Sequence, residues 1–245
     1  MNAGHRRQIE QAFSAAAEYD RHARVQRVAA RRLAARIADL PLPAFPRVLE
    51  IGCGTGFLTE ALMEHGIGGD WLITDISPDM LDRCQARLGK STDRRFMVLD
   101  GEYGDPGGPF DLVCSSLAMQ WFDNQATAFA RTRDWLAPGG HSIATTLGAG
   151  SFAEWRAAHA AEQVEAGMLD FLPAERLPAV AVERHVERHD SALDFLRALK
   201  AIGAHTAPSR HRPLPPPALR RVMRRFEAAG AAVSYEIITC HYQRA

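Results

Sequence analysis

The feature that most constrains the fold is the loop Gly52–Gly56, in which glycine occupies the first, third and fifth positions. The apolar run Val48–Ile51 before it has the length of a buried strand, and Phe57–His65 after it predicts a helix. Glycines allow a sharp strand-to-helix turn and let a ligand approach the main chain closely. The spacing departs from the G-x-G-x-x-G pattern of nicotinamide-binding loops, because position 57 is phenylalanine. Taken alone, the loop indicates only a tight turn.

The residues after the loop alternate between predicted strands and helices. Predicted strands cover 71–75, 95–99, 110–115 and 141–147, predicted helices cover 77–88 and 124–135, and a turn at 138–140 leads into the last strand. Ser77 followed by Pro78 is a typical helix start. This alternation predicts an α/β fold, with a parallel sheet and helices on both faces.

The flanking regions follow other patterns. Before the loop, 8–38 has helical spacing of apolar residues, and prolines at 41, 43 and 46 end that helix. After it, we predict helices at 151–169, 191–202 and 218–229, strands at 182–188 and 233–242, and an irregular loop at 206–217, which holds five prolines. The chain is thus divided into an N-terminal helical segment that closes over the cofactor (1–46), a cofactor-binding core (47–147), a helical cap (148–180) and the remaining sheet with helices (181–245).

Acidic side chains are predicted at the carboxyl ends of two further strands. Asp75 ends the strand after the glycine loop, and Asp100 and Glu102 follow the third strand. Ligands of open α/β sheets bind at this edge, where carboxylates accept hydrogen bonds from a ribose or from an adenine amino group. One such acid is more often a solvated cap. A glycine loop and two acids in consecutive order predict a nucleoside-containing ligand instead.

Charge and cysteine content exclude several classes of protein. The 29 basic and 29 acidic residues balance, whereas a generic nucleic-acid binder needs a net or clustered positive field. The four cysteines are too widely spaced for a zinc site, so we expect no metal and free thiols in a reducing compartment. The polar N-terminus predicts no signal peptide, and no apolar run reaches the ~20 residues that span a bilayer. We therefore expect a cytoplasmic protein with no membrane or nucleic-acid partner.

The ordered motifs VLEIGCGTG, TDISPDML, LDGE, FDLVCSS and LAPGG, spread over residues 47–147, resemble the class I S-adenosylmethionine-dependent methyltransferases. The resemblance implies a Rossmann-like seven-stranded methyltransferase sheet with helices on both faces and a helical cap inserted after strand five. It also implies S-adenosylmethionine as the cofactor. The residues it assigns to that cofactor are Glu50, Gly52, Cys53 and Gly54 along the methionine part, Asp75 on the ribose, Ile76 and Met80 beside the adenine, Asp100, Gly101 and Glu102 at the adenine edge, and Ser115 near the reacting end.

A narrower resemblance covers most of the chain. Residues 12–26, the SSLAMQW segment at 115–121 and residues 199–204 are similar to the malonyl-[acyl-carrier protein] O-methyltransferases, which begin pimeloyl synthesis for biotin. This resemblance implies methyl transfer to the free carboxylate of a malonyl group, with an acyl-carrier protein as partner. It also places Tyr19 and Gln26 beside the cofactor.

The implied reaction makes limited demands on the protein. A carboxylate has a reference pKa near ~4 and is ionised at neutral pH, so its methylation needs no general base. Catalysis would be mainly alignment of the reactants and exclusion of water. Candidates for the reacting centre are Tyr19 as a lid residue and Ser116, Gln120 and Trp121 after the fourth strand; Arg156 and Lys200 are candidates for the substrate carboxylate. For Tyr19 and Trp121 an ordinary packed position is at least as consistent with the sequence, and for Arg156 and Lys200 a solvated position is favoured.

Arginines cluster on the helix predicted at 218–229. Arg220, Arg221, Arg224 and Arg225 share one side of it, which predicts either a solvated face or a docking surface for an acidic carrier protein.

Two other functions stay open at this point. One is a methyltransferase of the same class with a small-molecule or quinone-like acceptor, which would want a catalytic base. The other is a cofactor-binding regulatory protein without catalysis. A turnover assay separates the second from the enzymes, and a panel of acceptors separates the enzymes from each other.

Overall fold

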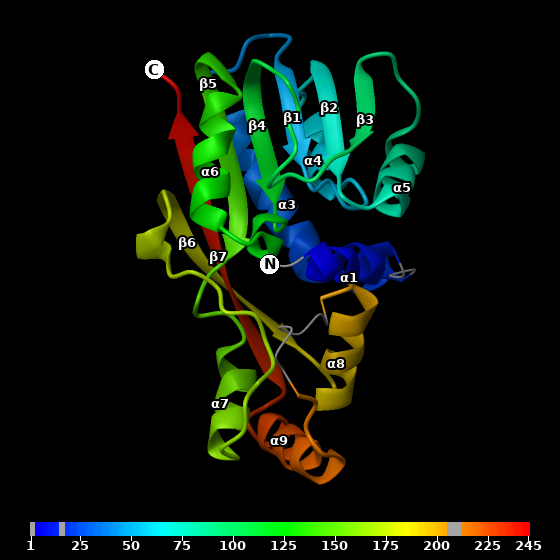
Figure 1. Ribbon diagram of the computed structural model, residues 1–245, viewed down its shortest axis with the longest axis vertical. Helices are drawn as coiled ribbons and strands as arrows, with labels where there is room; N and C mark the ends of the chain where they lie inside the picture. The colour runs from blue at the N-terminus through cyan, green and yellow to red at the C-terminus, as the bar shows by residue number, and fades with distance from the viewer. Residues whose placement is uncertain (1–2, 15–17, 205–211) are drawn as a thin grey trace. The chain divides into compact units, whose positions relative to one another are not determined.

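The computed structural model describes residues 3–14, 18–204 and 212–245 (Figure 1). The chain divides into two compact units. The sheet unit comprises 26–146, 174–182 and 238–245, and the helical unit comprises 1–25, 147–173 and 183–237. None of the described helices is both long and apolar enough to cross a membrane.

Within the described residues, seven strands form one sheet in the order β3-β2-β1-β4-β5-β7-β6. Their bounds are β1 (Arg47–Ile51), β2 (Asp70–Asp75), β3 (Arg94–Val98), β4 (Phe110–Ser116), β5 (Leu136–Leu147), β6 (Ala179–Arg188) and β7 (Ala232–Gln243). All neighbouring pairs from β3 to β5 are parallel, and Val48 of β1 lies between Trp71 of β2 and Leu112 of β4. The order and the pairing confirm the predicted Rossmann-like methyltransferase sheet.

Strand β7 runs antiparallel to β5, so the sheet is mixed. The N–H of Gly139 donates to the carbonyl of Arg244 at 2.9 Å, and that of Gly148, just beyond β5, donates to the carbonyl of Glu236 at 2.8 Å. The Arg244 N–H donates in turn to Gly140 at 2.9 Å. The predicted turn at 138–140 is therefore wrong, because these glycines pair with the end of β7 and extend β5.

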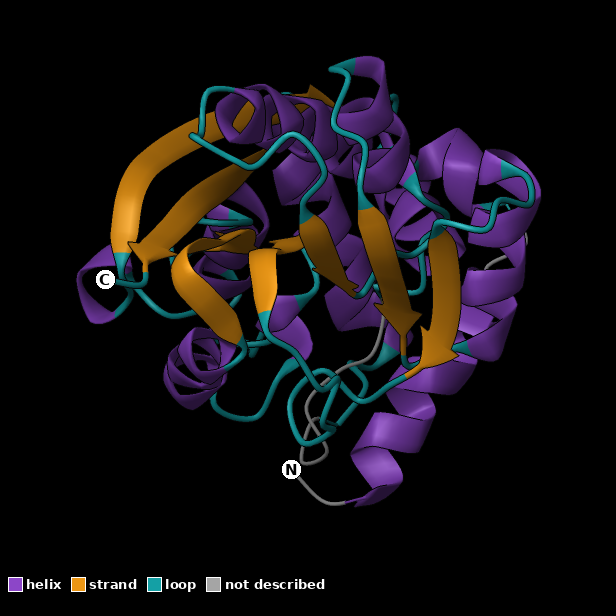
Figure 2. Cartoon of the chain, turned by 90° about the horizontal axis from the view of Figure 1, so that it is seen from above, coloured by secondary structure: helices purple, strands orange, loops and turns teal. Residues whose placement is uncertain are grey.

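Helices cover both faces of the sheet, as predicted. In the sheet unit, α6 lies on one face and α3 and α4 lie on the other (Figure 1), and Figure 2 shows helices on both sides of the strands. Helix α5 begins after Ser77, whose Oγ accepts a hydrogen bond from the N–H of Met80 at 3.3 Å. The helices are α1 (Ala3–Ser14), α2 (Tyr19–His22), α3 (Arg24–Ala38), α4 (Phe57–Glu64), α5 (Pro78–Leu88), α6 (Gln125–Asp134), α7 (Ala153–Ala161), α8 (Ala192–Ala201) and α9 (Pro216–Ala228), with 3-10 turns η1 (Met119–Trp121) and η2 (Ala174–Arg176).

The single helix predicted over 8–38 is wrong. The structure has three helices there, and residues 15–17 lie outside the described part of the chain. Ala23 separates α2 from α3 with ψ +50°, and its side chain is completely buried. Alanine has the highest helix propensity, so an alanine at position 23 does not predict a break in the helix. The break coincides with the buried Ala23, and no helix-breaking residue marks it in the local sequence.

The helix predicted over 151–169 is also too long. Helix α7 ends at Ala161, and Gln163 adopts a left-handed conformation with φ +57°. The chain then folds back, because the guanidinium of Arg156 donates to the carbonyl of Leu169 at 2.6 Å. Such a long-range contact is invisible to helical periodicity.

The proline-rich segment starts a helix rather than staying irregular throughout. Residues 212–215 lack regular structure, residues 205–211 lie outside the described part of the chain, and Pro216 and Pro217 form the first turn of α9. Proline is tolerated there because the first N–H groups of a helix have no partner within the helix.

Aromatic side chains form the core of the helical unit. Phe195 is fully buried, and its ring centroid lies 5.3 Å from Trp155 and 5.4 Å from Phe226. Phe152 and Tyr235 meet edge to face at 5.0 Å. These contacts hold α7, α8, α9 and the first part of β7 together, at spacings typical of favourable aromatic pairs.

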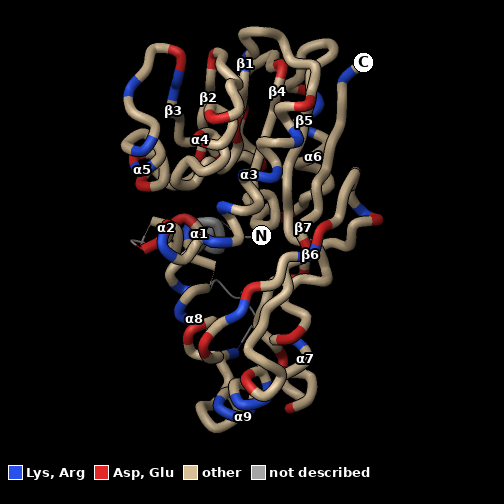
Figure 3. Tube along the Cα trace, turned by 180° about the vertical axis from the view of Figure 1, so that it is seen from behind, with Lys and Arg blue, Asp and Glu red and all other residues tan. Residues whose placement is uncertain are grey.

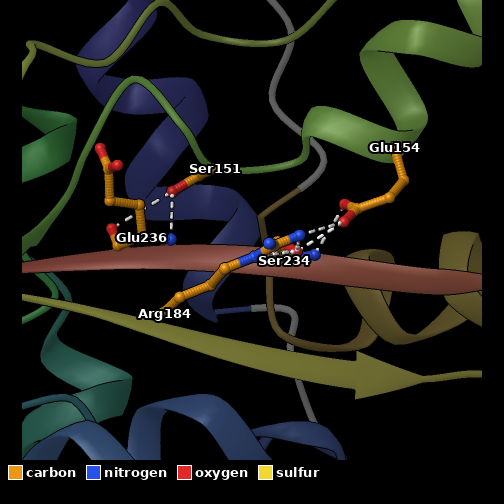
Figure 4. A network of polar contacts seen from close by, with 5 residues as sticks. All are labelled: Ser151, Glu154, Arg184, Ser234 and Glu236. Atoms are coloured by element: carbon orange, nitrogen blue, oxygen red, sulfur yellow. Dashed lines mark hydrogen bonds and ion pairs between the residues drawn. The ribbon is translucent and has the colours of Figure 1, made fainter.

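A polar network ties the start of α7 to the two strands beside it (Figure 4). Glu154 accepts hydrogen bonds from the Ser234 N–H at 2.8 Å and from Arg184 at 2.9 Å. The Ser151 Oγ accepts from the Glu236 N–H at 3.0 Å. Burial alone would raise the pKa of Glu154, but the hydrogen bonds from Ser234 and Arg184 outweigh it and lower that pKa.

Candidate functional site

The glycine loop Gly52–Gly56 follows β1 and opens α4, as predicted. Gly52 has φ +68°, and a Cβ added to it would lie 2.4 Å from the Cβ of Ala118. Gly56, with φ +92°, caps α4 in a left-handed conformation. Both positions therefore require glycine. Gly52 and Gly54 are partly exposed, so a ligand can reach this part of the loop.

The back of the loop is anchored by side chains from neighbouring helices. The Nε of Arg87, in α5, donates to the carbonyl of Thr55 at 2.7 Å. The Phe57 ring lies between two guanidinium groups, with Arg87 4.7 Å and Arg27 4.4 Å from its centroid. These contacts could not be predicted, because no motif or spacing in the sequence connects positions 27, 57 and 87.

Asp75 lies at the carboxyl end of β2, beside the loop. Its two carboxylate oxygens accept hydrogen bonds from the N–H groups of Gly54, at 2.8 Å, and Ser77, at 2.9 Å. Burial raises the pKa of Asp75, and these backbone hydrogen bonds counteract part of the rise. The structure thus joins the first two predicted elements of the site, the glycine loop and this carboxylate.

Glu50 lies beneath the loop on β1 and is 1% exposed. Its carboxyl accepts a hydrogen bond from the hydroxyl of Thr59 in α4. Burial raises the pKa of Glu50 to about 8, the bond from Thr59 opposes the rise, and the charge of Asp75 adds to it. Glu50 thus supports the loop from beneath through Thr59, and its predicted contact with the cofactor stays a prediction.

The segment after β3 carries the predicted adenine contacts. One Asp100 oxygen accepts hydrogen bonds from the N–H groups of Glu102, at 3.0 Å, and Tyr103, at 3.2 Å. The Glu102 carboxylate is buried and accepts from the N–H groups of Asp123 and Asn124, at 2.9 and 2.8 Å. Glu102 thus secures the segment leading into α6, and its predicted contact with the cofactor stays a prediction.

The end of β4 brings the other candidates to the same edge of the sheet. Ser115 is buried, and its hydroxyl donates to the Ile51 carbonyl at 2.8 Å, so it links β4 to β1. Ser116 ends β4, and Gln120 and Trp121 lie in η1. Of the other cofactor candidates, Met80 is buried in α5, Ile76 and Gly101 are half-buried, Cys53 is buried in the loop, and Gln26 is half-buried in α3.

The remaining candidates belong to the helical unit. Tyr19 is the first residue of α2, and Lys200 is exposed near the end of α8. The guanidinium of Arg156 is engaged by the Leu169 carbonyl and by Asp170, 3.6 Å away. The roles of these residues stay predictions. Among the described residues, no group of three or more His, Cys, Asp or Glu side chains is arranged to hold a metal ion.

Comparisons with known proteins define the class. Residues 48–140 match the methyltransferase domain family. The chain also superposes on a methyltransferase structure from Bacillus halodurans with a TM-score of 0.59, at 12% identity, covering 87% of this chain and 98% of that one. With the glycine loop and Asp75 in place, the protein is a class I S-adenosylmethionine-dependent methyltransferase by fold.

Two relatives define the family within this class. The malonyl-[acyl-carrier protein] O-methyltransferase of Magnetococcus marinus is 41% identical, over 95% of this chain and 90% of its own length. The biotin biosynthesis bifunctional protein BioCD of Bordetella avium is 46% identical over 94% of this chain, which spans 51% of that longer protein. The chain belongs to the malonyl-[acyl-carrier protein] O-methyltransferase family.

Proposed function

We propose that the protein methylates the free carboxylate of a malonyl group carried by an acyl-carrier protein, at the start of pimeloyl synthesis for biotin. The observation that carries this proposal is the 41% identity to a malonyl-[acyl-carrier protein] O-methyltransferase over nearly the full length of both chains. The methyl ester hides a charge, so that enzymes built for apolar acyl chains accept the product. A cytoplasmic location is part of the same proposal.

The cofactor-binding residues fit S-adenosylmethionine, which supplies a methyl group on a sulfonium when it is bound. The main chain of Gly52 and Gly54 would lie along the methionine part, with Glu50 supporting the loop from beneath and Asp75 beside it. The carboxylate of Asp75 would accept hydrogen bonds from the ribose, and Asp100 would meet the adenine edge. These residues bind and orient the cofactor, and none of them has to move a proton.

The proposed acceptor explains why no general base is required. A malonyl carboxylate is ionised at neutral pH. Its negative charge is lost in the transition state, so a site that binds the carboxylate too strongly would slow the reaction. The protein has to align the carboxylate oxygen with the methyl carbon and exclude water, which Ser116 and Trp121 are proposed to do.

The experiment measures transfer of a labelled methyl group from S-adenosylmethionine to malonyl-[acyl-carrier protein], with acetyl-[acyl-carrier protein] as control. Labelling of the malonyl form alone supports the proposal, because the acetyl form lacks the free carboxylate. If neither form is labelled while calorimetry shows cofactor binding, the proposal is wrong. Small-molecule and quinone acceptors are then tested, and failure of every acceptor would indicate a regulatory protein.

A further inference from the structure

The segment Ser116–Phe122, which we call the β4 strap, contacts both loops that would hold the cofactor. On one side the Ala118 Cβ occupies the space that a side chain at Gly52 would need, 2.4 Å from the added Cβ. On the other side, a Cβ added to Gly101 would lie 2.3 Å from the Ile51 side chain of β1 and 3.0 Å from the Phe122 ring. The β4 strap therefore packs against both the Gly52–Gly56 loop and the segment that contains Gly101, within the sheet unit.

The β4 strap contains a strained residue at its turning point. Leu117 has φ +49°, a left-handed conformation that is unfavourable for a bulky side chain, and it is 8% exposed. Its N–H donates to the carbonyl of Thr145 in β5 at 3.0 Å and lies 3.2 Å from the Thr145 Oγ1. Such strain persists only where surrounding contacts hold it in place. Leu117 directs the chain so that Ala118 meets Gly52.

Gln120 supplies the second hold on this turn. Its side-chain Nε2 donates to the carbonyl of Leu117 at 2.5 Å, and the residue is 8% exposed. The side-chain carbonyl oxygen of Gln120 is buried and has no hydrogen-bond partner among the described residues. A buried carbonyl without a partner is unfavourable for folding. Folding stability therefore does not explain an amide at this position. The side-chain N–H group, in contrast, holds the Leu117 carbonyl.

We propose that Gln120 is a positioning residue for cofactor binding: it clamps the Leu117 carbonyl, keeps Leu117 left-handed, and so holds the β4 strap against the Gly52 and Gly101 loops. This role differs from the contact with substrate that its place in the sequence predicts. The inference rests on the cofactor of the proposed function and is independent of the acceptor.

The test is the variant Gln120→Leu, which keeps the size of the side chain and removes both the clamp and the unpartnered carbonyl. We expect calorimetry to show about tenfold weaker binding of S-adenosylhomocysteine, while Tm without ligand stays the same or rises. Gln125→Leu is the matched control, because Gln125 is also buried, also has a side-chain oxygen without a partner among the described residues, and lies in α6. It should leave the dissociation constant unchanged.

A second variant tests the route through Leu117. Asparagine adopts the left-handed conformation more readily than leucine. The double variant Leu117→Asn/Gln120→Leu should therefore recover part of the affinity lost in Gln120→Leu. Unchanged affinity in Gln120→Leu, an equal loss in Gln125→Leu, or no recovery in the double variant would overturn the proposal. Failure to methylate malonyl-[acyl-carrier protein] with these affinities as expected would instead refute only the proposed acceptor.

Discussion

Asp75 joins the glycine loop to the end of β2 and is the residue proposed to hold the ribose of the cofactor. We expect Asp75→Asn to weaken S-adenosylmethionine binding by about 30-fold, because the ribose would lose a charged acceptor and charge-assisted hydrogen bonds are the stronger kind. Isothermal calorimetry measures this change. Stability should also fall by about 1 kcal/mol, since the Gly54 and Ser77 N–H groups lose a charged partner.

Asp70→Asn is the control for this experiment, because Asp70 lies on the same strand at its other end and pairs with Arg95. The control should bind the cofactor as the wild type does. Equal binding by Asp75→Asn and wild type would show that Asp75 does not hold the ribose.

Glu50 is expected to lower the free energy of unfolding at alkaline pH. Its pKa is raised from 4.5 to about 8 in the folded protein, so folding favours the protonated carboxyl. The stability this provides is complete below pH 4.5 and is lost as the pH rises through about 8. We expect Glu50→Gln to remove this decline, on the order of 3 kcal/mol between pH 5 and pH 9, in chemical denaturation of the cofactor-free protein.

The exposed Glu64, in α4, is the control for this titration, and Glu64→Gln should keep the wild-type dependence. A steep alkaline loss of stability in Glu50→Gln would assign the effect to another group.

At the residue scale, the sequence predicts the site residues that follow strands. It does not predict the helix side chains that hold those residues in place. Asp75 and the glycine loop were predictable, because strand ends in an α/β sheet meet at one edge. Thr59, which donates to Glu50, and Arg87, which holds Thr55, come from helices and have no sequence signature. The two backbone hydrogen bonds to Glu102 were equally unpredictable. Their donors belong to residues 123 and 124, which local sequence does not place beside Glu102.

At the scale of elements, the pairing of β5 with β7 contains a titratable contact. The Nδ1 of His141 lies 3.0 Å from the Nε2 of His241, and the rings stack at 5.2 Å. Burial lowers the pKa of both, and His241 lowers that of His141 further. Because the folded state disfavours the protonated rings, stability falls as the pH drops below about 6.5.

We expect His241→Phe to move the midpoint of acid unfolding to lower pH, since phenylalanine keeps the stacking and cannot be protonated. Circular dichroism followed during acid titration measures this midpoint. His65→Phe, at an exposed position, should leave it in place. If the two variants behave alike, the histidine pair is not the source of acid sensitivity.

The elements themselves were predictable where local patterns suffice. Helix α4 was expected at Phe57–His65 and covers Phe57–Glu64, and α5 was expected from the Ser77-Pro78 start signal. The break at Ala23 and the early end of α7 were not, because no helix-breaking residue marks the first and the second depends on the contact between Arg156 and Leu169. Local sequence thus determined the parallel core better than the helical unit.

At the scale of the whole molecule, net charge is zero but helix α9 is strongly basic (Figure 3). Arg221 and Arg225 pair with Glu162, and these two contacts lower the pKa of that carboxyl. Arg220 and Arg224 are exposed and, within the described residues, have no carboxylate partner. They are therefore the arginines that remain available to an acidic carrier protein.

We expect Arg220→Glu/Arg224→Glu to raise KM for malonyl-[acyl-carrier protein] about tenfold at low salt, because charge steering is lost. KM of this double variant for a small malonyl thioester should not change. The control variant Lys90→Glu, which reverses an exposed charge of the sheet unit, should keep the wild-type KM for malonyl-[acyl-carrier protein]. Steady-state kinetics at two salt concentrations measure both. Equal KM values for carrier substrate in variant and wild type would exclude this face as the docking surface.

The position of β7 in the sheet has a consequence for how the protein is made. It lies between β5 and β6, yet it follows both in the chain. During translation, β5 therefore leaves the ribosome with one edge unpaired. That edge stays unpaired by β7 until some ninety further residues have been synthesised. An unpaired strand edge is a template for pairing with other nascent chains, so we expect β5 to be prone to such pairing until β7 has been synthesised.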